Sequence, residues 1–175
     1  MGQFTIDVQQ IKNRARQHIE MGAVTSAYGC DLDTALKLLN EALATEIVCV
    51  MRYKLHYQMA SGLNSESIAN EFQEHAREEQ DHVDRIATRI SQLNGEPNFN
   101  PEGLAERAQT DYVRCESLTE MIQENLIAER IVIDIYNEMI RFFGESDPTT
   151  RRLLEHILRE EEEHAEDLKN LLPNQ

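Results

Sequence analysis

"REEEEHAED", residues 159–167, places four consecutive glutamates before His164, and "HAREEQDHVDRI", residues 75–86, repeats part of this pattern. In both stretches a glutamate precedes a histidine by three residues: Glu161 precedes His164, and Glu79 precedes His82. Residues three apart on an α-helix lie on the same face, so each pair can point at one site. Glu-x-x-His alone is a weak signal in a chain so rich in glutamate. Its meaning depends on which way the helices that carry it face.

The composition predicts an all-α chain. Its 175 residues are enough for one domain with a sizeable core, so we interpret residues 1–175 as a single domain. The sequence is 41% hydrophobic and has only 7 glycines and 4 prolines, which favours long helices over many short strands. The formal charge of −15 makes nucleic acid an unlikely partner and suits the attraction of cations.

The chain also carries signals of its compartment. We find no apolar run typical of a signal peptide and no stretch long enough to span a bilayer. The three cysteines, Cys30, Cys49 and Cys115, form no C-x-x-C motif. These features predict a reduced, cytoplasmic protein without a membrane partner.

Capping residues divide the chain into an N-terminal helix and four long helices. Apolar residues at helical spacing predict the first helix over 5–27. Asp31 or Asp33 then caps a helix reaching residue 61, and Ser65 or Ser67 opens one that ends at residue 94, before Gly95. A Ser-x-x-Glu capping box at 117–120 begins a third helix, which stops at residue 144. Asp-Pro at 147–148 begins the fourth, so the bundle covers residues 33–172.

The connections between these helices predict the topology. The first and second long helices are joined by a few residues, as are the third and fourth, so each pair forms an antiparallel hairpin. The connection between the hairpins, "GEPNFNPEGLAERAQTDYVRCE" at 95–116, is much longer and contains a short helix opening at Asn100-Pro101. We therefore predict a four-helix bundle with one long crossover.

Each long helix carries one glutamate in its apolar stripe. Stepping along the helices by three and four residues selects Glu46, Glu79, Glu129 and Glu161. The apolar residues of the four stripes are Leu39, Leu43, Val50, Tyr53 and Tyr57; Phe72, Ala76, Val83, Ile86, Ile90 and Leu93; Ile122, Leu126, Ile133, Tyr136, Ile140 and Phe143; and Leu154, Ile157, Leu168 and Leu171. Each glutamate lies near the midpoint of its helix, so the four meet at one level of the bundle.

Four buried carboxylates at one level need compensation. The desolvation cost is on the order of several kcal/mol for each charge. Lysine and arginine avoid the four stripes, whereas two divalent cations would balance the charge. The alternative is that some of the glutamates are protonated or lie at the rim of the bundle. Glu160, four residues before His164, is the one rival to Glu161 as a ligand.

Other polar residues have simpler interpretations. His75 lies one turn before Glu79 and either assists metal passage or is a polar residue at the bundle edge. We expect His18, His56 and His156 at the surface or rim. Cys49, one turn after Glu46, is either an ordinary buried thiol or a redox-active one.

One glutamate from each of two helices, with Glu-x-x-His from each of two others, resembles the dinuclear site of the ferritin-like superfamily. The resemblance covers about residues 33–172 and implies the following di-iron ligands: Glu46, Glu79, His82, Glu129, Glu161 and His164. It implies two irons per subunit, bridged by Glu79 and Glu129. Tyr53, two turns after Glu46, matches the tyrosine that bacterioferritins keep beside their iron centre and is the candidate catalytic residue.

The resemblance also distinguishes between branches of the superfamily. Bacterioferritins bind haem through a methionine directly after the glutamate of the second helix, and here that residue is Gln80, so we expect no haem. We expect no short fifth helix after His164. The N-terminal helix and the short crossover helix are similar to those of Dps-like mini-ferritins that keep a bacterioferritin-type site inside each bundle. Such proteins carry a cysteine pair; Cys115 corresponds to one member, while Arg130 and Ile131 stand where the other is expected.

The resemblance implies a ferroxidase that oxidises Fe(II) with hydrogen peroxide or oxygen and stores ferric mineral in a hollow homo-oligomeric shell, and it favours 12 subunits over the larger shell. One alternative is a rubrerythrin-like di-iron peroxidase without storage, which normally needs the paired C-x-x-C motifs that this chain lacks. The other is a non-enzymatic Dps-type nucleoid protein, which the acidic charge disfavours.

Overall fold

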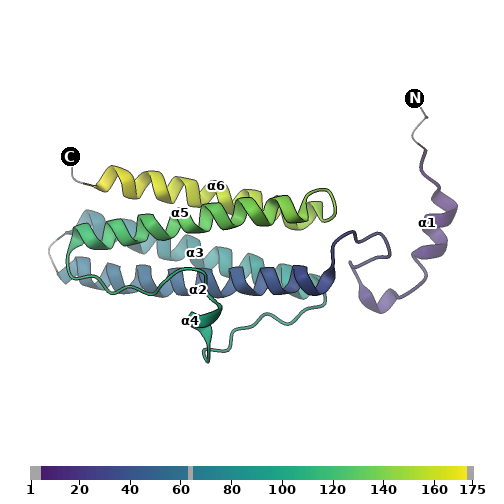
Figure 1. The fold of residues 1–175 in the computed structure, drawn as a ribbon, viewed down its shortest axis with the longest axis horizontal. Helices are drawn as coiled ribbons and strands as arrows, with labels where there is room; N and C mark the ends of the chain where they lie inside the picture. The colour runs from purple at the N-terminus through teal and green to yellow at the C-terminus, as the bar shows by residue number, and fades with distance from the viewer. Residues whose placement is uncertain (1–4, 63–64, 173–175) are drawn as a thin grey trace.

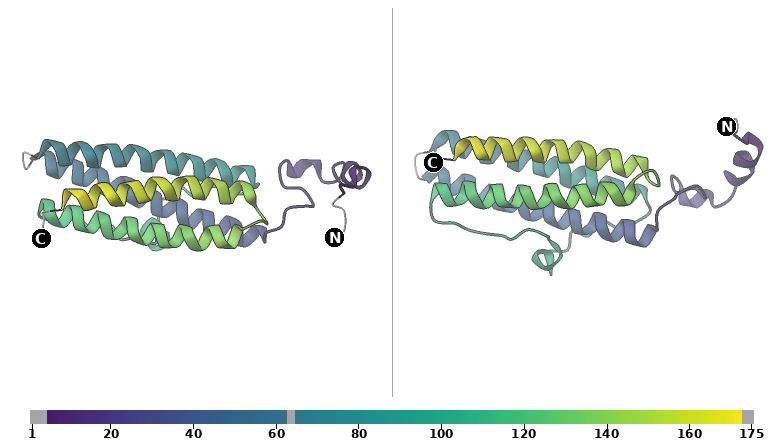
Figure 2. Two further views of the ribbon diagram at one scale, coloured as in Figure 1. Left: turned by 90° about the horizontal axis from the view of Figure 1, so that it is seen from above. Right: turned by 45° about the horizontal axis from the view of Figure 1, so that its top comes forward.

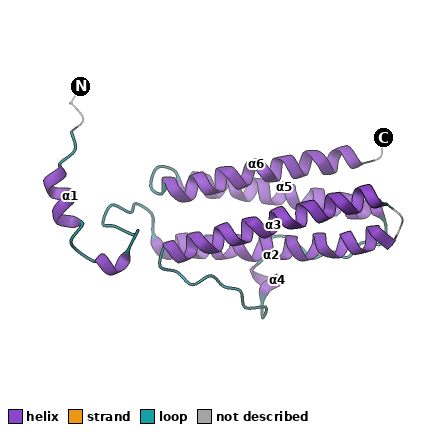
Figure 3. Ribbon diagram, turned by 180° about the vertical axis from the view of Figure 1, so that it is seen from behind, coloured by secondary structure: helices purple, strands orange, loops and turns teal. Residues whose placement is uncertain are grey.

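The computed structural model describes residues 5–62 and 65–172, and every regular element in these ranges is a helix (Figure 3). The four long helices are α2 (Leu32–Gly62), α3 (Glu66–Gln92), α5 (Leu118–Phe143) and α6 (Pro148–Leu171). Hairpins α2/α3 and α5/α6 lie side by side as one four-helix bundle (Figures 1 and 2). The predicted bundle and its pairing are therefore confirmed. Within the described ranges, no helix is apolar over a long enough stretch to cross a membrane.

Capping residues begin α5 and α6 where the sequence predicts. The Ser117 hydroxyl accepts a hydrogen bond from the Glu120 amide, and the Glu120 side chain accepts one in return, which completes the capping box. Asp147 caps α6 by accepting from the Thr150 amide at 2.9 Å. The same carboxylate receives Arg89 from α3 at 2.9 Å, so one residue both begins a helix and ties the two hairpins together.

The end of α3 differs from the prediction. Asn94, not Gly95, adopts the left-handed conformation there, with φ 63°. Gly95 is needed for packing instead: a Cβ at this position would lie 2.4 Å from Leu36 Cδ2 on α2. The glycine therefore allows the crossover to leave α3 close against its neighbour.

The predicted N-terminal helix over 5–27 is wrong in extent. Helix α1 covers only Val8–Arg14, followed by a 3₁₀ turn, η1, at Ile19–Met21. His18 and Gly22 have positive φ values of 51° and 56°. His18 separates α1 from η1, and Gly22 ends η1. Val8 is 55% and Ile11 45% exposed, because α1 projects away from the end of the bundle (Figure 1). A short helix without a surface to cover its apolar side gains little from burial.

The crossover packs its single helical turn, α4 (Leu104–Arg107), beside α2 (Figure 1). Its return segment is held by a buried polar network that the sequence did not predict. Arg52 of α2, 1% exposed, donates to the Asn125 side chain of α5 at 2.8 Å and to the Asp111 carbonyl at 3.0 Å. His56, expected at the surface, is fully buried and bonds Asn125 at 2.9 Å and the Val113 carbonyl at 3.0 Å.

The predicted core stripes are confirmed in α2, α3 and α6 except at Tyr57 and Leu171, which are half-buried. In α5 every second predicted position is confirmed: Ile122, Glu129, Tyr136 and Phe143 are buried. Asn125, Val132 and Met139 are buried in α5, whereas Leu126 and Ile133 are only half-buried. The apolar core has two parts, one around Ile86 and one around Phe72. The level of the four glutamates lies between them.

Candidate metal centre

All four stripe glutamates are fully buried at the middle of the bundle. Glu46 of α2, Glu79 of α3, Glu129 of α5 and Glu161 of α6 each have 0% exposure. His82 and His164, one turn after Glu79 and Glu161, are 1% and 2% exposed. The structure thus brings together the six side chains that the sequence selected.

The six residues form two overlapping groups, which we call position one and position two. Position one consists of Glu46, Glu79, His82 and Glu161, and position two of Glu79, Glu129, Glu161 and His164. In each position one ligand atom from every residue lies within 4.8 Å of the others. His82 Nδ1, for example, is 3.1 Å from Glu161 Oε1, and His164 Nδ1 is 3.3 Å from Glu161 Oε2.

The shared residues differ from those implied by the resemblance. Glu79 and Glu161 belong to both positions, whereas Glu129 belongs to one. Tyr53 donates its hydroxyl proton to Glu129 Oε1, and Tyr136 donates to Glu46 Oε1. These two bonds leave Glu129 and Glu46 one inward oxygen each, while both oxygens of Glu79 and Glu161 have no hydrogen-bond partner.

The donor atoms of this centre fit metal ions. In the described part of the chain, ten buried side-chain nitrogen and oxygen atoms have no hydrogen-bond partner. Apart from the Nε atoms of Arg107 and Arg151, all of these, the remaining eight, belong to the six residues of positions one and two. Buried polar atoms are normally paired, so eight unpaired atoms at one level fit cation ligands. Carboxylate oxygen and imidazole nitrogen with shared carboxylates suit iron(II).

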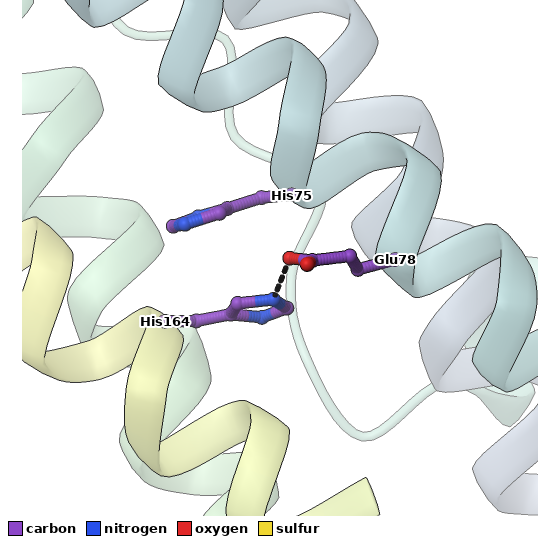
Figure 4. A group of neighbouring side chains, drawn as sticks. All are labelled: His75, Glu78 and His164. Atoms are coloured by element: carbon purple, nitrogen blue, oxygen red, sulfur yellow. Dashed lines mark hydrogen bonds and ion pairs between the residues drawn. The ribbon is translucent and has the colours of Figure 1, made fainter.

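An outer carboxylate orients each histidine. His82 Nε2 lies 3.1 Å from Glu160 of α6, and His164 Nε2 lies 2.7 Å from Glu78 of α3. Figure 4 shows the bond between Glu78 and His164. An ionised carboxylate can only accept, so each imidazole donates from Nε2 and turns Nδ1 inward, where a cation can replace the Nδ1 proton. Glu160 was the predicted rival ligand, and its carboxylate instead bonds the outer face of His82.

The sequence analysis did not predict that Glu78 and Glu160 orient the two histidines, although the sequence contains a pattern that indicates it. Both helices carry Glu-Glu-x-x-His, at 78–82 and 160–164. The second glutamate of each motif faces the centre, and the first reaches the histidine of the opposite helix. The repeated doublet could have suggested this exchange.

Burial and charge divide the four carboxyl groups into two kinds. Burial, together with the neighbouring carboxylates, raises the pKa of Glu46 and Glu129 well above the ordinary value. Burial acts in the same direction on Glu79 and Glu161, but it is outweighed, at Glu79 by contacts with the Glu46 carboxyl and the two imidazoles and at Glu161 by contacts with the two imidazoles, so the pKa of both carboxyls is lowered. The two shared glutamates are therefore the ones held ionised.

Burial and the neighbouring carboxylates also shift the pKa of the histidines. Burial disfavours a charged imidazole, but the carboxylates around His82 and His164 outweigh this effect and raise the pKa of both. A cation that binds at Nδ1 must displace these protons. His75, expected to assist metal passage or to lie at the bundle edge, is 2% exposed, and burial and His164 lower its pKa to about 4.

Comparison with known proteins agrees with this geometry. The ferritin-like domain family matches residues 36–174. The chain belongs to the ferritin-like family. It is 31% identical over 147 residues to the DNA protection during starvation protein of Pyrococcus furiosus, covering 82% of this chain and 80% of that one. Over 138 residues it is 31% identical to bacterioferritin BfrA of Mycobacterium tuberculosis, covering 78% of this chain and 82% of the relative.

Solved structures place this ferritin-like chain among the same proteins. It superposes with a TM-score of 0.77 on the dodecameric thioferritin, a bacterioferritin-related protein, of Bacteroides fragilis. The two are 33% identical, and the match covers 81% of this chain and 86% of the other. Dps of Thermosynechococcus elongatus shares the fold, also with a TM-score of 0.77, at 21% identity.

Proposed function

We propose that this ferritin-like protein is a ferroxidase that stores iron. Positions one and two would each bind one Fe(II) inside a single subunit. Two bound iron(II) ions supply one electron each, enough to reduce one hydrogen peroxide to water without releasing hydroxyl radical. The observation that carries the proposal is the set of eight unpaired inward donor atoms on six buried residues.

The protein residues contribute orientation, charge and exclusion of water. Glu79 and Glu161 hold both positions at a fixed separation because each offers an oxygen to either side. Glu46, held by Tyr136, would complete position one, and Glu129, held by Tyr53, would complete position two. Complete burial limits access of water to the bound cations.

Tyr53 is the candidate catalytic residue. It donates to Glu129 and lies 3.2 Å from His75 Nδ1, so it links position two to a second polar side chain. Both electrons for one peroxide come from the two Fe(II) ions, so the phenol would act by holding Glu129 and by relaying a proton along these hydrogen bonds. Tyr53→Phe should slow Fe(II) oxidation while leaving the number of bound cations unchanged, with Tyr112→Phe, at an exposed tyrosine of the crossover, as the control.

Storage is the second part of the proposal. The relatives named bacterioferritin and dodecameric thioferritin support a hollow homo-oligomer. Aerobic Fe(II) loading, with oxygen or with peroxide, tests both parts. We expect rapid oxidation, and iron retained in the assembly well beyond two per subunit. Retention of only two per subunit would favour the rubrerythrin-like peroxidase and reject storage.

We expect the loaded protein to contain no haem. Gln80 stands directly after Glu79, is exposed, and bonds Asp84 at 3.2 Å on its own helix. Its amide has no soft donor for a haem iron. An absorption spectrum of the purified protein without a Soret band is the expected result.

A further inference from the structure

The N-terminal arm, residues 5–20, exposes apolar side chains that its own bundle does not cover. Four of the large hydrophobic residues that are strongly exposed in the described chain lie here: Ile6 at 63%, Val8 at 55%, Ile11 at 45% and Ile19 at 78%. Singly scattered apolar residues are normal on a protein surface, whereas a group of them marks an interaction site. The arm therefore has the composition of a segment that packs against a partner.

The root of the arm is fixed to the end of the bundle. The Asn94 side chain, just after α3, donates to the Met21 carbonyl at 2.8 Å, and the Tyr28 hydroxyl donates to Asp147 at 3.1 Å. Beyond these contacts α1 projects away from the bundle in every view (Figures 1, 2 and 3). Within the described chain, α1 packs against no other helix. Its apolar side is thus presented to a neighbouring molecule.

Helix α1 is amphipathic, with basic residues beside its apolar face. Val8, Ile11 and Ala15 recur at spacings of three and four, so they lie on one face. At 3.6 residues per turn, Lys12 and Arg14 lie on opposite sides of that face. The arm contains three basic and two acidic residues, so its formal charge is +1, whereas the whole chain carries −15. The arm is therefore suited to an apolar surface with an acidic border.

A groove of this kind lies between α2 and α5, beside the crossover. Its volume is about 480 Å³, and its apolar lining comes from Leu38, Ile135, Met139 and Phe142. Phe142 is 41% exposed although its ring is large and apolar. We call this hollow the α2/α5 groove.

The acidic border of the α2/α5 groove complements the arm. Asp134 and Glu138 belong to its lining, and both are exposed. Glu138 pairs with Arg141 of its own helix, which is itself largely exposed, and Asp134 has no ion pair among the described residues. An amphipathic helix in an apolar groove is a recurring mode of recognition. With the apolar face of α1 on the floor of the groove, Lys12 and Arg14 come beside these carboxylates.

We propose that α1 of one subunit docks in the α2/α5 groove of a second copy of this chain. Val8 and Ile11 pack on Phe142 and its apolar neighbours, and the basic residues of α1 pair with Asp134 and Glu138. The groove lies along the side of the bundle, whereas α1 extends beyond its end, so the occupant is the helix of another subunit. The inference rests on the homo-oligomer of the proposed function and does not require metal binding.

Cross-linking of the full-length protein tests the contact. Val8→Cys combined with Phe142→Cys should form a disulfide under mild oxidation, and non-reducing electrophoresis should show covalent dimers and larger species. The control combines Val8→Cys with Glu155→Cys, because Glu155 is exposed on α6 outside the groove. Each single variant measures the background from the native cysteines. Native mass spectrometry of every variant checks that it assembles.

The outcomes separate this inference from the proposed function. Cross-linked dimers in the test variant alone support docking between copies. A disulfide within one chain would overturn the inference, because α1 would then occupy the groove of its own subunit. An assembled test variant that cross-links no more than the control would also overturn it and leave storage standing. A monomeric wild-type protein would overturn both.

Charge reversal provides a second measurement that does not depend on cysteine. Lys12→Glu with Arg14→Glu, or Asp134→Lys with Glu138→Lys, should speed the exchange of subunits between labelled assemblies by at least about tenfold, because like charges then meet. Combining the two pairs of substitutions should restore slow exchange. Glu162→Lys with Glu166→Lys, at exposed positions of α6, should leave the rate unchanged. Failure of the combined variant to recover would show that these charges do not meet.

Discussion

At the residue scale, Glu161 is one of two side chains, with Glu79, that both candidate metal positions share. It offers one oxygen to each position, whereas its neighbour Glu162 is exposed. Glu161→Ala should lower cation affinity at both positions by more than about 100-fold, because loss of an outer partner alone costs roughly 10–100-fold. Calorimetry with cobalt(II) measures this, with Glu162→Ala as the control.

The same substitution should weaken the metal-free fold. The Glu161 carboxylate lies 3.1 Å from His82 Nδ1 and 3.3 Å from His164 Nδ1, and its loss leaves two buried charged imidazoles with fewer partners, so urea unfolding of chelator-treated Glu161→Ala should show lower stability than wild type. Equal or greater stability would mean that repulsion among the four carboxyl groups outweighs these contacts.

The outer carboxylates give a graded prediction. Glu78→Gln and Glu160→Gln keep the size of the side chain but weaken the hold on His164 and His82, respectively. Cation affinity should fall by about 10–100-fold, less than for Glu161→Ala. If Glu160→Gln abolishes binding and Glu161→Ala does not, the assignment of the two glutamates is reversed.

Metal binding should release protons. The pKa of His82 and His164 is raised above the ordinary value of 6.5, so the metal-free imidazoles hold their protons at neutral pH. A cation displaces them, and affinity should therefore rise with pH over the whole range below the raised pKa of the two imidazoles. Calorimetric titrations in buffers of different ionisation enthalpy should reveal the released protons; a binding heat independent of buffer would contradict this.

The inward residues could be predicted from the sequence because helical periodicity fixes the direction of a side chain relative to its own stripe. Partners across helices could not. The bonds from Glu78 to His164 and from Arg52 to Asn125 depend on the rotation and height of a neighbouring helix. His56 looked like a surface residue for the same reason: its partners lie on α5 and the crossover.

At the element scale, Asp147 is a helix cap that also pairs with a residue of another helix. Asp31 of the N-terminal turn of α2 accepts from the Thr34 amide at 2.9 Å, as Asp147 accepts from Thr150, but Asp147 also receives the largely buried Arg89. Asp147→Ala should cost about 3–5 kcal/mol in the free energy of unfolding, because it leaves a guanidinium without its partner. Asp31→Ala should cost about 1 kcal/mol. Urea unfolding at one protein concentration compares them, and equal costs would show that the ion pair adds nothing.

Helix positions were predictable where a cap and a buried stripe agreed, as in α5 and α6. Helix positions were not predictable where only one of these two signals was present. The apolar spacing around Val8 and Ile11 suggested a long N-terminal helix, but no surface of the bundle covers these side chains. In α5, Asn125 rather than Leu126 faces inward, because Asn125 bonds the buried Arg52.

At the scale of the whole molecule, assembly is the main expectation. Because the similar thioferritin is described as dodecameric, we expect a closed shell of 12 copies. Native mass spectrometry of the purified protein tests this. A monomer or simple dimer would reject storage but would leave the metal centre as a separate question.

The exchange of ligands between the two hairpins has a consequence for the integrity of the bundle. Hairpin α2/α3 supplies three residues of position one and one of position two, and hairpin α5/α6 supplies the reverse. Neither half of the chain therefore contains a complete coordination set. If the centre binds ions as proposed, the bound ions would link the two hairpins, and separating the hairpins would require the ions to leave first. The metal-loaded subunit should then resist proteolysis for longer than the metal-free one.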